Sequence, residues 1–164
     1  MGREVRRVPP NWKHPRYDEG PNTGEFKSCN DEDYETASKR WEADFASFMR
    51  GEHKACEYGS IRHFWEWESP PDEETCRPAF TEPATWFQVY QTVSEGSPVT
   101  PPFATEEALI DWLVEQGESH GTKYEKKYTR AAASAFVKAG SAPSMVVSSH
   151  GVLTGIGFMG LTEE

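Results

Sequence analysis

The stretch that decides the fold is WFQVYQTVSEGSPVTPPFATEEALIDWLVEQG at residues 86–117. Its first part, 86–93, is rich in aromatic and β-branched side chains, which predicts a strand, with a helix as the competing interpretation. A glycine and several prolines then end the strand. Thr105 caps a predicted helix over 105–116, which ends at Gly117. A strand and a helix joined in this way indicate a mixed fold that is neither all-α nor all-β.

The rest of the chain predicts two further helices and a hairpin. Residues 31–50 carry an apolar stripe at helical spacing behind acidic residues that favour a helix N-terminus. Residues 122–125 have the form of a capping box and start a helix that runs to 139. The expected fold class is therefore α+β: a small antiparallel sheet (strands near 86–93, 144–149 and 152–158) packed with about three helices (31–50, 105–116 and 122–139) and long loops.

The chain length of 164 residues is that of one domain, and we expect a single domain over 1–164. Residues 1–29 are predicted to be an extended arm, because prolines at 9, 10 and 15 exclude a helix interior. Trp12 is the candidate anchor that would hold this arm to the body of the protein.

Charge and composition limit the function. A formal net charge of -10 and a pI near 5.0 oppose non-specific nucleic-acid binding and favour a partner with a basic surface. No apolar run is long enough to span a bilayer, and the basic N-terminus leads into prolines rather than an apolar signal segment. We therefore expect a cytoplasmic protein without membrane contact or direct nucleic-acid contact. No motif indicates a cofactor.

A zinc site is a weak alternative to no metal at all. His53, Cys56, His63 and Cys76 are ligand types that zinc prefers. His53 and Cys56 are close in sequence, but a loop separates His63 from Cys76. The competing interpretation is scattered surface histidines and half-buried thiols.

The segment FWEWE at 64–68 is the most suggestive part of the chain. It alternates rings with carboxylates and continues into the acidic residues at 72–74. In a short amphipathic strand over 61–68, a face of Trp65 and Trp67 would be buried while Glu66 and Glu68 point outward. Tryptophan beside charge is typical of binding hot spots. A core strand with a solvated face has about equal weight. The candidate binding residues are Trp65, Glu66, Trp67, Glu68, Asp72, Glu73 and Glu74, with a second face at Asp111, Glu115 and Glu118.

Three blocks resemble a group of small uncharacterised proteins encoded by phages and prophages. They are VPPNWKHP at 8–15, SEGSPVTPPFATEEALIDWL at 94–113 and APSMVV at 142–147. The resemblance implies a setting and no catalytic residues. Small accessory phage proteins commonly bind and disable a host machine, including CRISPR complexes.

Binding is therefore expected in preference to catalysis. The first hypothesis is a phage-type accessory protein that inhibits a host protein or ribonucleoprotein complex stoichiometrically through an acidic, nucleic-acid-mimicking surface. The second is a small enzyme or ligand-binding protein that uses the loop at 94–98 and a histidine. A minor virion or assembly component is the third, and a homodimer stays open.

Overall fold

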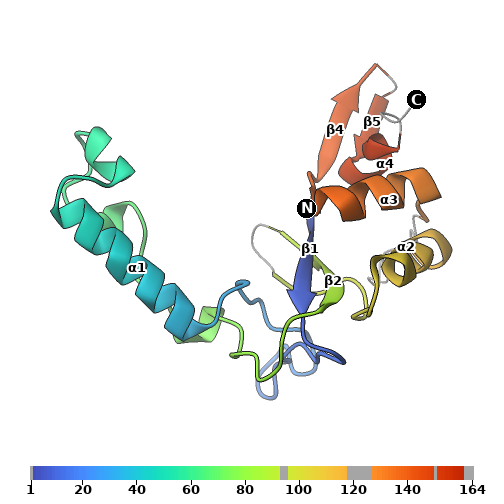
Figure 1. Ribbon diagram of the computed structural model, residues 1–164, viewed down its shortest axis with the longest axis horizontal. Coiled ribbons are helices and arrows are strands. Elements are labelled where there is room, and N and C mark those ends of the chain that lie inside the picture. The colour runs from blue at the N-terminus through green and yellow to red at the C-terminus, as the bar shows by residue number, and fades with distance from the viewer. Residues whose placement is uncertain (1, 93–95, 118–126, 150, 161–164) are drawn as a thin grey trace. The chain divides into compact units, whose positions relative to one another are not determined.

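The computed structural model describes residues 2–92, 96–117, 127–149 and 151–160 (Figure 1). The chain forms two compact units. Unit 1 comprises Met1–Ser28 and Phe80–Glu164, and unit 2 comprises Cys29–Ala79. The single domain expected over 1–164 stays a prediction.

Unit 1 is built on a three-stranded antiparallel sheet in the order β2-β1-β3. The strands are β1 (Arg3–Val8), β2 (Trp86–Gln91) and β3 (Ser141–Ala142). The middle strand β1 lies within the segment expected to be only an extended arm. Val5 pairs with Val89 and Arg6 pairs with Gln88, so the register of β1 against β2 is continuous along both strands.

The two faces of β2 have different roles, because side chains of a strand alternate. Phe87 and Val89 face the main core with α2 (Glu106–Glu115), α3 (Arg130–Ala139) and α4 (Gly155–Met159). Leu109, Leu113 and Phe136 from these helices are fully buried in the same cluster. Gln88 and Tyr90 point to the opposite face, which the chain after β1 covers.

The C-terminal strands form a separate two-stranded sheet, β4 (Met145–Ser148) and β5 (Gly151–Thr154). The hairpin is confirmed, but the strand expected to reach 158 ends at Thr154 and α4 follows. Thr154 ends it because its side chain accepts a hydrogen bond from the Gly157 amide and so caps a helix. The third predicted helix begins at Arg130, and the expected capping box at 122–125 lies outside the described residues.

Unit 2 contains the long helix α1 (Tyr34–Met49) and three 3-10 turns, η1 (Lys54–Glu57), η2 (Phe64–Glu66) and η3 (Glu73–Thr75). Asp33 caps α1 by accepting from the Thr36 amide. The short strand considered at 61–68 is wrong, because Phe64 turns inward as part of η2. Its ring is fully buried against Trp41, Phe45, Phe48 and His53, at centroid distances of 5.1–6.1 Å.

The α+β class is confirmed, although the strands belong to two sheets rather than one. Within the described residues no helix is long and apolar enough to cross a membrane.

Candidate functional site

The segment 58–74 of unit 2 carries exposed aromatic side chains. Trp65 is 54% exposed and stacks flat on His63, with ring centroids 4.3 Å apart. Trp67 is 39% exposed and lies 5.4 Å from the ring of Tyr58, which is itself 48% exposed. These three rings remain in solvent because Phe64 takes the buried position beside them.

The predicted carboxylates of this segment fall into two classes. Glu66 accepts from the backbone amides of Arg62 and His63, and these hydrogen bonds lower the pKa of its carboxyl. Glu68 pairs with Arg40 at 2.7 Å, and Asp72 accepts from an amide of η3. Glu66, Glu68 and Asp72 form the first class, because each of them stabilises the fold of unit 2.

Glu73 and Glu74 are exposed, and no ion pair forms on either in unit 2, all of which is described. Their charge is therefore available to a partner.

Most of the negative charge of the chain lies in unit 2. It holds 13 Asp and Glu residues against six Lys and Arg residues, a net charge of -7 out of -10. Arg40 alone is shared among Glu32, Asp44 and Glu68. Glu68 and Asp72 also line one pocket of about 460 Å³ together with Arg40, so the structure brings two predicted binding residues together.

In the second predicted face, only Asp111 has a salt-bridge partner among the described residues. Asp111 forms a salt bridge with Arg130, which also pairs with Glu107. Glu115 is exposed at the last position of α2, and Glu118 lies outside the described residues.

The zinc alternative finds no support among the described residues, where no group of three or more His, Cys, Asp or Glu side chains could hold a metal ion. His53 accepts from the Ala55 amide and so caps η1, and the exposed Cys56 contacts the Phe48 carbonyl. Cys76 is buried, and burial raises the pKa of its thiol.

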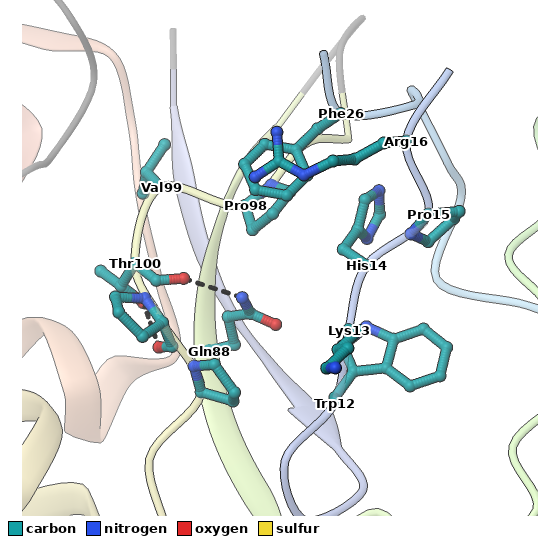
Figure 2. A pocket seen from close by; sticks show the side chains of 12 residues that line it. Trp12, Lys13, His14, Pro15, Arg16, Phe26, Gln88, Pro98, Val99 and Thr100 are labelled. Carbon is teal, nitrogen blue, oxygen red and sulfur yellow. Dashed lines mark hydrogen bonds between the residues drawn. The ribbon is translucent and has the colours of Figure 1, made fainter. Parts of the chain in front are cut away.

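Unit 1 contains a larger pocket, of about 730 Å³, that sequence reasoning did not find. Figure 2 shows Trp12, Lys13 and His14 on one side, Val99 and Thr100 on the other, and Gln88 between them. The twelve lining residues include two cations and no carboxylate: Trp12, Lys13, His14, Pro15, Arg16, Phe26, Gln88, Pro98, Val99, Thr100, Pro101 and Pro102.

A tight turn directs the chain from β1 into this pocket. The Trp12 amide donates to the Pro9 carbonyl at 3.2 Å, and Asn11 has a φ of 55°. Proline at the second position and asparagine with positive φ at the third are typical of a type II turn. Trp12 then packs edge-on against Phe80, with centroids 4.9 Å apart, which fixes its indole at the pocket wall.

His14 belongs to a chain of hydrogen bonds at the pocket floor. Its Nε2 lies 2.7 Å from the Lys27 carbonyl oxygen, which can only accept, so Nε2 carries a proton. Its Nδ1 lies 3.2 Å from the Tyr90 hydroxyl, which in turn lies 3.0 Å from Gln88 Oε1. The Gln88 amide is oriented because its Nε2 donates to the Thr100 carbonyl at 2.7 Å.

The chain of hydrogen bonds through His14, Tyr90 and Gln88 lacks one proton when His14 is neutral. The Tyr90 hydroxyl has one hydrogen, but Gln88 Oε1 and the unprotonated Nδ1 of His14 both face it as acceptors. A second proton on His14 lets Nδ1 donate to Tyr90 and Tyr90 donate to Gln88. Every member of the chain is then satisfied.

Burial of the imidazole opposes the addition of this second proton to His14. It lowers the pKa of His14 below 6.5, and the nearby charges of Arg6 and Arg16 lower it further, although the hydrogen bond to Lys27 acts in the opposite direction. Arg6 pairs with Glu4 at 2.7 Å and lies over the Tyr90 ring. His14 is therefore held neutral near pH 7.

The pocket residues come from distant parts of the sequence, which is why patterns along the chain missed them. Trp12 was singled out, but as an anchor and not as part of a pocket. The loop at 94–98 considered for an enzyme contributes Pro98, so a histidine and the end of that loop do meet here. Residues 93–95 lie outside the described part of the chain.

Chemically, the site combines a rigid apolar wall, two cations and a buried proton acceptor, and it is suited to holding a ligand. Comparison of this chain with protein families, curated proteins and solved structures finds no match.

Proposed function

We propose that the protein acts by stoichiometric binding, with unit 2 docking on a basic surface of a partner protein or ribonucleoprotein complex. The observation that carries this proposal is the segment 58–74, which presents half-exposed Trp65 and Trp67 together with Glu73 and Glu74, two exposed carboxylates that form no ion pair within unit 2. Tryptophan is enriched in binding hot spots.

Electrostatics supports a basic partner. A net charge of -7 on unit 2 accelerates encounter with a cationic surface and repels nucleic acid. The same distribution would let unit 2 occupy a groove meant for DNA or RNA. In this proposal the protein is a phage-type accessory protein that inhibits a host defence complex, such as a CRISPR effector, in the host cytoplasm.

Charge reversal of Glu73 and Glu74 tests the proposal, because neither residue has an ion-pair partner within unit 2. The matched control is Asp18→Lys with Glu19→Lys, an equal charge change on exposed neighbouring residues of unit 1. Each protein is used as bait in host lysate, and captured proteins are quantified by mass spectrometry. The proposal expects a set of basic proteins captured by the wild type and the control and lost with Glu73→Lys and Glu74→Lys.

The captured complex is then purified, and its activity is titrated with the wild-type protein. Stoichiometric inhibition saturates at about one copy per target. Unchanged capture by the reversed variant contradicts the proposal, and so does loss of target activity at a small fraction of one copy, since that would indicate an enzyme.

A further inference from the structure

We propose that the pocket of unit 1 binds a small anion that carries a flat ring, and that His14 takes up a proton when the anion binds. This inference is independent of the binding surface on unit 2. It rests on the charge of the pocket, the rings and prolines that shape it, and the hydrogen-bond chain at its floor.

The sign of the charge comes from the lining residues. Lys13 and Arg16 are exposed at the pocket, and none of its lining residues is acidic. The Arg16 guanidinium lies 3.7 Å from the centre of the Phe26 ring, and one N–H group donates to the Gly24 carbonyl. Stacking holds the guanidinium plane in place, and its remaining donors suit a carboxylate or phosphate.

The requirement for a flat ring comes from the walls. Trp12 is half-buried, and its contact with Phe80 holds the indole at the pocket. Four of the lining residues are prolines, at 15, 98, 101 and 102, so the walls lose little freedom when a ligand enters. Aromatic rings stack on each other and on proline-lined apolar walls, and a volume of about 730 Å³ accommodates a nucleotide-sized molecule.

Proton uptake follows from the groups that surround His14. From the neighbouring strands it faces the Tyr90 hydroxyl and the cation of Arg6, which Glu4 pairs; from its own loop it faces Arg16 and the Lys27 carbonyl. Lys13 lines the same pocket. Burial is the main cause that opposes a charge on His14, and the charges of Arg6 and Arg16 add to it. An anion bound at Lys13 and Arg16 offsets the part that comes from these charges. The imidazolium then completes the chain through Tyr90 to Gln88.

The first experiment separates ring from charge by NMR titration of the full chain with two sets of probes. Indole-3-acetate is compared with neutral indole-3-acetamide and with acetate, and adenosine monophosphate is compared with adenosine and with ribose 5-phosphate. The proposal expects at least one ringed anion to bind about tenfold or more tightly than both of its partial analogues. The two sets distinguish a carboxylate from a phosphate ligand. If neither ringed anion exceeds its analogues, the binding proposal is overturned.

Variants locate the site. Lys13→Ala should weaken binding several-fold, whereas Lys138→Ala, an equal charge change at an exposed position of α3 outside the pocket, should leave it unchanged. Arg16→Lys keeps the charge but loses the planar stack, and should also weaken binding. Equal losses from Lys13→Ala and Lys138→Ala would show a general charge effect and overturn the placement.

The pH dependence of binding tests the proton. A carboxylate probe stays ionised between about pH 8 and about pH 6, so its own charge does not change. Wild-type affinity should rise several-fold as the pH falls over this range. His14→Gln can keep the contact with the Lys27 carbonyl but does not titrate, and its affinity should be flat. A flat wild-type curve, or an equal slope in His14→Gln, overturns the proton uptake.

Discussion

Phe64→Ala is the substitution that unit 2 should tolerate least. The Phe64 side chain has 0% exposure and contacts four rings of the same unit. A buried phenylalanine removes roughly 150–250 Å² from water, which at about 25 cal/mol/Å² corresponds to about 4–6 kcal/mol for the whole side chain. Alanine retains only part of this, so the expected loss in the free energy of unfolding is about 3–5 kcal/mol.

Hydrogen exchange read by mass spectrometry measures this loss locally, which matters because the chain has two compact units. Peptides within 34–68 should exchange about a hundred-fold to several-thousand-fold faster, since each 1.4 kcal/mol is a factor of ten. The matched control is Phe136→Ala, which removes an equally buried ring from unit 1 and should accelerate exchange there. A loss below about 1 kcal/mol for Phe64→Ala, or faster exchange confined to unit 1, would refute the assignment of Phe64 as the centre of unit 2.

Three further predictions concern pH, packing and thiol chemistry. Because the pKa of His14 is lowered in the folded state, the unfolded chain binds the His14 proton more tightly than the folded chain does. The urea midpoint of unit 1 should therefore be highest above about pH 6.5 and fall below it. His14→Gln should remove this pH dependence. Gly155→Ala, at the start of α4, should destabilise unit 1 by about 1–3 kcal/mol in urea denaturation, because a Cβ there overlaps the Pro143 carbonyl. Gly59→Ala is the control, because a Cβ there meets nothing within 4 Å and the change should be close to neutral. In native protein a thiol reagent should label the exposed Cys56 at once and the other two cysteines only on unfolding; equal rates at all three would contradict their burial.

Local signals made much of the fold predictable. The helices expected at 31–50 and 105–116 are present because their caps and apolar spacing are encoded within a few residues. The side chain of Thr105 accepts from the Ala108 amide, as its place before two glutamates indicated. The strand at 86–93 is present because its aromatic and β-branched residues suit a strand buried on both faces.

The middle strand of the sheet was missed for a reason that a pattern along the chain cannot contain. β1 reads REVRRV, and three arginines in six residues do not resemble a buried strand. Arg6 is nevertheless 8% exposed, because its guanidinium lies over the Tyr90 ring and pairs with Glu4. Both contacts depend on the finished sheet.

The pocket could not be predicted for a similar reason, since His14, Lys27, Gln88 and Thr100 meet only after the sheet and the loop following β1 are in place. On unit 2, the strand considered over 61–68 would bury a face of Trp65 and Trp67 and point Glu66 and Glu68 outward. In the structure Phe64 is the buried residue and both tryptophans are half-exposed. The segment forms a 3-10 turn rather than a strand because Phe64 points into the core of unit 2, and the neighbouring residues do not predict this orientation.

The position of β1 also determines the order in which the chain can fold as it is synthesised. β1 is made first, but its partners β2 and β3 come from 86–91 and 141–142, with all of unit 2 in between. Unit 2 can bury Phe64 with local contacts at a stage when β1 is still unpaired, because β2 and β3 have not yet been synthesised. Charged side chains discourage such an edge from pairing with another chain. The arginines of β1, which make it hard to recognise as a strand in the sequence, therefore oppose its pairing with another chain until its own sheet forms.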